Sequence, residues 1–250
     1  PYLQENLDEI ITVEDDELIV AFNLYCKIPF SKISARHPMV ISLAEAIGRT
    51  PSAVAWKLVN FATLDPSLQA RNIKGASNTG KMDKVIFDEF IHNWDELAYE
   101  SEIALANLVC TTIETPLELD SSLEQIELKE GKVKEVITKA RVNQNFFRKM
   151  ILSSYENKCC ITGMRVDSLL VASHIIPWAK DEANRTNPEN GLCLNSLHDK
   201  AFDVGLITID TSYQVRVSKH ISDFENDTSI QKFFLDYDRN KITLPKRFLP

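Results

Sequence analysis

Apolar residues in the first hundred positions recur three or four residues apart, a spacing that predicts helices. We expect helices at residues 18–25, 38–47, 51–61 and 83–106. Pro29 ends the first helix, and Gly48 ends the second. Thr50 is a favourable N-cap for the third helix, and Pro51 suits its first position. A helix, a turn with glycine and a capped helix form the pattern of a helix-turn-helix.

The second half of the chain changes period after one more helix, expected at about residues 133–155. We expect short strands at residues 169–176, 191–194, 206–209 and 213–217, with a short helix at 197–204. A polar loop at 178–189 separates the first two strands. Strand, loop, strand and helix make a ββα arrangement, so the expected fold class is α+β.

Residues 111–131 combine Pro116, a serine pair and many acidic residues, which predicts a linker. We therefore expect a helical module at residues 1–110, an acidic linker at 111–131 and a second domain at 132–250. The chain opens at Pro1 rather than at a methionine, which favours a piece of a longer protein. No signal peptide or membrane-spanning apolar run is visible, so we expect a cytoplasmic protein without membrane contact.

The charge of individual segments is more informative than the net charge of the chain. The net charge of −8 is untypical of a protein that binds nucleic acid. Residues 25–84, however, carry nine basic against three acidic residues, and residues 131–165 carry eight against two. Phosphate contact requires a basic face rather than a basic total, so both segments are candidate DNA-binding surfaces. The alternative is that both are solvated helix faces.

The five cysteines form no C-x-x-C pair, which predicts buried thiols rather than a four-cysteine zinc site.

Candidate chemistry gathers in the string SHIIPW…NPENGLCLNSLHDKAFDVG, which holds His174, Asn190 and His198. Cleavage of a phosphodiester requires an activated water, stabilisation of charge on the phosphate and help for the leaving oxygen. A neutral histidine supplies a base near pH 7, and a divalent cation supplies the other two functions.

This string, with the upstream RVNQNFFRKMILSSYENKCCITG, resembles the HNH endonuclease family over residues 132–217. The resemblance implies a ββα-metal nuclease that cuts double-stranded DNA with one divalent ion per site. Mg²⁺ is the expected metal, with Mn²⁺, Ni²⁺ and Zn²⁺ as alternatives. It implies that His174 is the general base, that Asn190 orients the loop and that His198 binds the metal. Arg148 and Lys149, on the helix before the first strand, are expected to contact the DNA backbone.

The string differs from the commoner family pattern at two positions that often supply metal ligands. Ser173 precedes the base where an acidic residue or a histidine is frequent, and Phe202 stands one turn beyond His198. Ser173 and Asp203 remain as candidate second ligands, together with a group beyond the C-terminus. The alternative role for Asp203 is a hydrogen bond to backbone at the end of the helix.

The string LAEAIGRTPSAVAWKLVNF resembles the helix-turn-helix of Myb/SANT-like domains. This likeness implies that Arg49, Ser52, Trp56 and Lys57 lie near DNA. The expected protein is thus a helix-turn-helix-like module followed by an HNH nuclease, suited to a bacterial restriction or anti-phage role and to a homodimer. One rival is a catalytically degenerate HNH fold that binds DNA or regulates. A second rival is that residues 1–110 dock protein.

Overall fold

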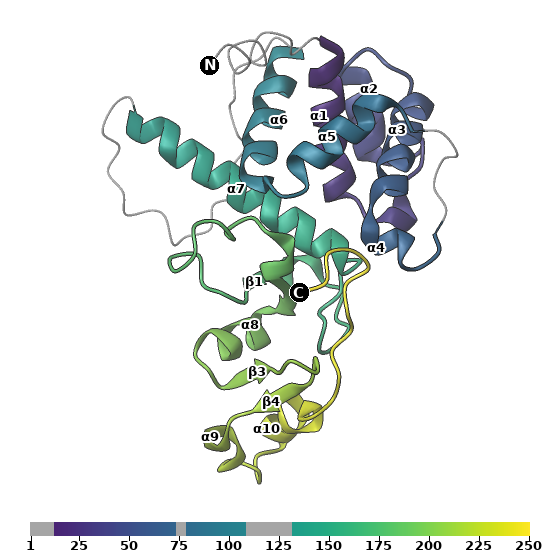
Figure 1. Ribbon diagram of the computed structural model, residues 1–250. Helices are drawn as coiled ribbons and strands as arrows, with labels where there is room; N and C mark the ends of the chain where they lie inside the picture. The colour runs from purple at the N-terminus through teal and green to yellow at the C-terminus, as the bar shows by residue number, and fades with distance from the viewer. Residues whose placement is uncertain (1–12, 74–78, 109–131) are drawn as a thin grey trace. The chain divides into compact units, whose positions relative to one another are not determined.

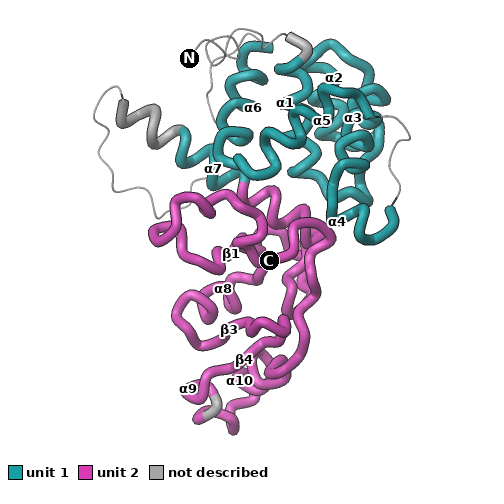
Figure 2. Tube along the Cα trace, viewed as in Figure 1, with its two compact units in different colours: residues 1–146 teal, residues 147–250 magenta. Residues whose placement is uncertain are grey.

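The computed structural model describes residues 13–73, 79–108 and 132–250 (Figure 1). The chain divides into two compact units, Pro1–Phe146 and Phe147–Pro250 (Figure 2). The division falls inside helix α7, Lys132–Ser154, so this one helix contributes residues to both units. The linker predicted at 111–131 lies outside the described residues and stays a prediction.

The first unit is helical throughout its described part. Its helices are α1 Val13–Lys27, α2 Pro38–Ala46, α3 Pro51–Leu64, α4 Pro66–Gln69, α5 Lys81–Phe90 and α6 Trp94–Leu108. The prediction of one helix over 83–106 was wrong, because a turn at 91–93 separates α5 from α6. Asp95 and Glu96 stand in the first turn of α6, where acidic side chains favour a helix start. The break lets α5 and α6 each pack against α1.

The core of this unit forms around Phe22, which is fully buried on α1. Its ring lies 4.9 Å from the ring of Phe61 on α3, 5.4 Å from that of Phe87 on α5 and 6.4 Å from that of Trp94 on α6. One aromatic side chain thus joins four helices. Burial of rings at such separations is a large source of stability in a small helical unit.

Helices α2 and α3 are joined by a tight turn at Gly48. Gly48 has a φ of +67°, which favours glycine at the end of a helix. The Thr50 hydroxyl then accepts a hydrogen bond of 3.2 Å from the Ala53 amide, so the predicted N-cap of α3 is confirmed. The two helices pack against each other. The DNA-binding module built on this pattern stays a prediction.

The second unit contains the predicted order of strand, loop, strand and helix. Strand β1, Leu170–His174, pairs antiparallel with β2, Gly191–Asn195, and α8, Ser196–Asp203, follows directly. The Asn195 side chain accepts the His198 amide at 2.9 Å and so caps α8. The register places His174 opposite Gly191 and Ser173 opposite Leu192. The ββα prediction is therefore confirmed.

The apolar side of the hairpin packs on α7. Phe147 and Ile151 of α7, together with Tyr155 directly after the helix, share a buried cluster with Leu170 of β1 and Leu192 of β2. Gly191 is the point of closest approach, because a Cβ there would lie 2.9 Å from Phe147 Cζ and would overlap the Ile151 side chain. Only glycine allows α7 to lie this near the end of the hairpin.

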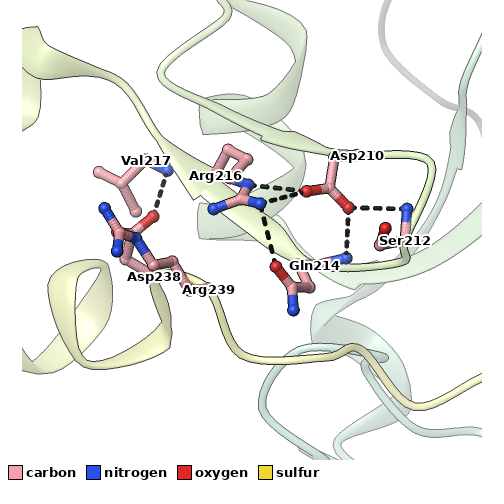
Figure 3. A network of polar contacts seen from close by, with 7 residues as sticks. All are labelled: Asp210, Ser212, Gln214, Arg216, Val217, Asp238 and Arg239. Atoms are coloured by element: carbon pink, nitrogen blue, oxygen red, sulfur yellow. Dashed lines mark hydrogen bonds and ion pairs between the residues drawn. The ribbon is translucent and has the colours of Figure 1, made fainter.

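A second hairpin, β3 Ile207–Ile209 and β4 Val215–Val217, follows α8 as predicted. Figure 3 shows the polar network at its turn, where the Asp210 carboxylate accepts the amides of Ser212 at 2.9 Å and Gln214 at 3.0 Å. The same carboxylate accepts Arg216 at 2.7 Å. These bonds fix the turn without a glycine.

The hairpin is followed by helices α9 Lys219–Ser222 and α10 Thr228–Phe233 and by the short turn η5 Leu235–Tyr237. Among the described residues, no helix has the length and apolar character that crossing a membrane requires.

Candidate active site

His174 ends β1 with its ring enclosed on several sides. The ring is stacked on Phe147 of α7, with centroids 4.0 Å apart and planes 9° apart. Trp178 meets it edge-on at 5.5 Å. The nitrogen Nε2 lies 2.9 Å from the carbonyl oxygen of Arg185, in the loop between β1 and β2. The histidine predicted as the base is thus half-buried and held from more than one direction.

The carbonyl contact decides which nitrogen carries the proton. A carbonyl only accepts, so Nε2 donates to Arg185, and the neutral ring leaves a lone pair on Nδ1. Within the described ranges, Nδ1 has no hydrogen-bond partner. Burial lowers the pKa of His174, while the Arg185 carbonyl and the negative charge of Asp203 oppose that lowering. The lowered pKa favours the neutral ring with Nδ1 available to take a proton.

Asn190 holds the loop that supplies this carbonyl. Its side-chain oxygen accepts the Ile176 amide at 2.7 Å. Its side-chain nitrogen donates to the carbonyl oxygens of Ile176 and Asn184, each at 3.1 Å. No bond joins this amide to the His174 ring in the part of the chain that the structure describes. Asn190 therefore acts on the loop, and Arg185 contacts the ring.

Arg185 is itself anchored, a contact that sequence reasoning missed. Its Nε donates to the carbonyl oxygen of Trp178 at 3.0 Å, and its guanidinium lies 5.3 Å from the Trp178 ring centroid. Glu182 pairs with the same guanidinium at 3.1 Å. The sequence signal for this contact was the presence of an arginine and a tryptophan in one polar loop.

His198, predicted as a catalytic residue and metal ligand, lies in a different environment. It is only 2% exposed. Its Nδ1 lies 3.0 Å from the Asn195 side-chain nitrogen, and its Nε2 lies 2.7 Å from the Phe233 carbonyl oxygen. Both ring nitrogens are therefore engaged within the protein. Ligation by His198 stays a prediction, and it requires the ring to give up one of these two bonds.

A thiol beside His198 was also missed from the sequence. Burial raises the pKa of Cys159, but interactions with the neighbouring His198, Thr162 and backbone amides bring this pKa down to about 7. The Asn195 side-chain nitrogen lies 3.7 Å from Cys159 Sγ. Cys159 is fully buried, like Cys160 and Cys193 nearby in the same core cluster. The prediction of buried thiols is confirmed for the four described cysteines, all of which are free.

The two remaining candidate ligands provide oxygen atoms. Asp203 is exposed at the end of α8, and its negative charge acts on His174. The predicted alternative, a backbone hydrogen bond at the helix end, is not among the contacts of the described residues. Ser173 is buried beside His174, and its hydroxyl has no hydrogen-bond partner within these residues. No group of three or more histidine, cysteine or acidic side chains able to hold a metal occurs in the described ranges.

The residues predicted to bind DNA from the first unit differ in availability. Trp56 on α3 is 63% exposed, and Ser52 is exposed on the same helix. Lys57 instead pairs with the buried carboxylate of Asp83 at 2.7 Å. Arg49 pairs with Glu17 at 2.9 Å. Acidic groups from elsewhere in the chain therefore neutralise two of the four predicted contacts.

The predicted contacts in the second unit are less engaged. Arg148 and Lys149 are both exposed on α7, directly after the Phe147 that stacks on His174. The described contact of Arg148 is a long one, 3.5 Å to the carbonyl oxygen of Asp167. An arginine and a lysine at the base of the hairpin thus leave positive charge open to solvent.

A comparison with protein-family models matches residues 159–210 to the family described as HNH endonuclease. Neither the comparison with curated proteins nor that with solved structures gives a match. The matched segment contains β1, β2, α8 and β3, and with them His174, Asn190 and His198. Residues 159–210 of this chain are therefore similar to the HNH endonuclease family.

Proposed function

We propose that this protein is a metal-dependent DNA endonuclease that hydrolyses phosphodiester bonds with His174 as its general base. The observation that carries the proposal is the state of the His174 ring inside a segment of the HNH endonuclease family. Nε2 donates to the Arg185 carbonyl, and Nδ1 keeps an open lone pair. A histidine that only stabilises the core satisfies both nitrogens, as His198 does.

In the proposed reaction, Nδ1 of His174 takes a proton from a water molecule as that water attacks the phosphorus. The bond from phosphorus to the leaving oxygen breaks, and the leaving oxygen takes a proton from solvent. The positive charge that develops on the ring is stabilised by the Arg185 carbonyl, which accepts a hydrogen bond from Nε2. Asn190 contributes by keeping the loop, and hence this carbonyl, in place. Proton removal by a positioned base typically accelerates such a step by a factor of about 10² to 10⁴.

The residues around His174 fit a hard divalent cation better than a soft one. Asp203 offers a carboxylate, and Ser173 offers a buried hydroxyl without a partner. Mg²⁺ commonly binds one or two carboxylates and completes its shell with water and substrate phosphate. When bound, such an ion stabilises charge on the phosphate and on the leaving oxygen. We propose Asp203 as the principal ligand, with Ser173 as a second candidate and His198 as a ligand only if its ring leaves Phe233.

DNA is the proposed substrate, and the exposed cations of α7 are its proposed contact. Arg148 and Lys149 stand next to the residue that stacks on the base, so phosphates bound there lie near the reacting group. On the first unit, Ser52 and Trp56 are the proposed contacts of the helix-turn-helix. One HNH site per chain cuts one strand, so double-strand cleavage in a restriction or anti-phage role favours a homodimer.

The rival function is a degenerate HNH fold that binds DNA without cutting it. The observation that favours it is that both ring nitrogens of His198 are engaged in the core.

The first prediction separates these two functions. His174→Ala removes the base, so plasmid cleavage by the full chain in Mg²⁺ or Mn²⁺ should fall by a factor of about 10² or more. His220→Ala, at an exposed histidine of the same unit, is the matched control and should cut normally. Intact plasmid with the unmodified protein in every metal supports the rival. Equal cutting by both variants shows that His174 is not the base.

The second prediction concerns pH. Protonation of His174 removes its ability to accept a proton, so kcat/KM should fall as the pH is lowered through the pKa of this group. Because burial lowers that pKa, the midpoint of the acid limb should lie below about 6.5, the ordinary value for histidine. The profile is measured on one oligonucleotide duplex at constant ionic strength. A midpoint above that value contradicts the assignment.

The third prediction concerns the metal. Asp203→Asn removes the carboxylate that we assign to the cation, so Mn²⁺ affinity should fall by a factor of about 10 to 100. Calorimetry with Mn²⁺ on the full chain measures this without any cleavage. Asp199→Asn, on the same helix, is the matched control and should bind Mn²⁺ as the unmodified protein does. An unchanged affinity in Asp203→Asn removes this residue from the metal shell.

The fourth prediction concerns DNA contact. Replacing Arg148 and Lys149 with alanine removes two phosphate contacts, so the slope of log affinity against log salt should decrease by about 2. The control replaces Lys232 and Lys241, two exposed lysines elsewhere in the unit, and changes the net charge equally. Binding is measured by fluorescence anisotropy in Ca²⁺ to limit cleavage. Equal slopes in the two double variants contradict the contact.

A further inference from the structure

Phe147 is a core residue that touches the proposed base directly. It is 2% exposed on α7, and its ring lies face to face with the His174 imidazole, 4.0 Å away and 9° from parallel. Most aromatic pairs in proteins are offset or edge-on, at centroid separations of 4.5–7 Å. This pair is closer and flatter, so one face of the imidazole is covered by the phenyl ring.

The close stack depends on the residue opposite His174 in the hairpin. Gly191 pairs with His174 across β1 and β2. A Cβ at Gly191 would come within 2.9 Å of Phe147 Cζ. The backbone there is extended, with φ −133°, so no left-handed conformation requires glycine at this position. What requires it is space for the side chains of α7.

The other contacts of the His174 ring do not fix the tilt of its plane. The bond from Nε2 to the Arg185 carbonyl fixes one nitrogen but allows the ring to tilt about it. Trp178 contacts the ring edge-on at 82° and limits its sideways movement. A flat neighbour on the face is what sets the plane. The Nδ1 lone pair lies in that plane, so setting the plane sets the direction in which Nδ1 accepts a proton.

We propose that Phe147 is a positioning residue, whose stack on His174 holds the imidazole plane in the orientation that proton transfer to Nδ1 requires. This inference rests on the proposed function of His174. It gives the helix before the hairpin a role beyond packing and DNA contact. It also fits the glycine at the start of β2, where a Cβ would overlap Ile151 and come within 2.9 Å of Phe147 Cζ.

The kinetic test replaces Phe147 with leucine and, separately, with methionine in the full chain. Both keep an apolar side chain but lose the flat face. We expect kcat to fall by a factor of about 10 to 100, with KM for a DNA duplex nearly unchanged, because small misplacements of a reacting group are costly. Phe146→Leu is the matched control and should keep its kcat. Phe146 is the neighbouring buried phenylalanine, and its ring lies 5.7 Å from the Lys27 ammonium.

The spectroscopic test needs neither metal nor DNA. A phenyl ring stacked on an imidazole shifts the carbon-bound protons of that imidazole upfield in the NMR spectrum. The His174 resonances, assigned by comparison with His174→Ala, should be upfield in the unmodified protein and in Phe146→Leu. They should move downfield in Phe147→Leu and Phe147→Met. If one variant folds poorly, the test still holds, because the upfield shift is measured in the unmodified protein.

The outcomes separate this inference from the function on which it rests. Normal cutting by His174→Ala overturns the proposed base and with it this inference. An inactive His174→Ala together with a normal kcat in Phe147→Leu overturns the inference alone. His174 protons at ordinary positions in the unmodified protein also overturn it, because the stack is then absent in solution. A fall in kcat with the expected loss of the upfield shift supports it.

Discussion

The candidate site depends on the closing of one loop by one amide. The Asn190 side chain forms hydrogen bonds with the backbone of Ile176, next to β1, and with the backbone of Asn184, within the loop. A side-chain amide has one acceptor and two donor hydrogens, and this one serves both ends of the loop at once. Together with the bond from Arg185 Nε to the Trp178 carbonyl, these bonds hold the loop that supplies the Arg185 carbonyl, which sets the tautomer of His174.

The two histidines of the motif show how environment assigns different roles to one residue type. His174 stands at the open end of β1, where an aromatic face and one carbonyl leave Nδ1 open. His198 stands in the first turn of α8, where the capping asparagine and the Phe233 carbonyl engage both ring nitrogens. Phe234 and Tyr237 also meet its ring edge-on. The first ring is available for chemistry, while the second joins α8 to the C-terminal segment.

Charge is used differently in the two units. In the first unit, Lys57, Arg49 and Lys27 pair with acids that lie far away in the sequence. The buried carboxylate of Asp83 also accepts Asn60 and the Gly80 amide, so its lysine is held by a network rather than by a single pair. Basic residues counted along a segment therefore overstate the positive charge that a ligand meets. On α7, Lys139 is likewise paired, with Glu96 at 2.8 Å, whereas Arg148 and Lys149 are exposed.

Local patterns in the sequence determined much of this protein. The capped helix at Thr50 and the order of strand, loop, strand and helix follow from short-range spacing, while the HNH segment around His174 and Asn190 follows from its resemblance to that family. The break at 91–93 did not, because both sides of it read as helix and only packing on α1 separates them. Three further features needed the tertiary structure: the stack of Phe147 on His174, the Arg185 carbonyl on Nε2, and the contact of His198 with Phe233. Each of these contacts joins residues that are far apart in the sequence. The periodicity of a short segment does not predict which distant residues will meet in the folded chain.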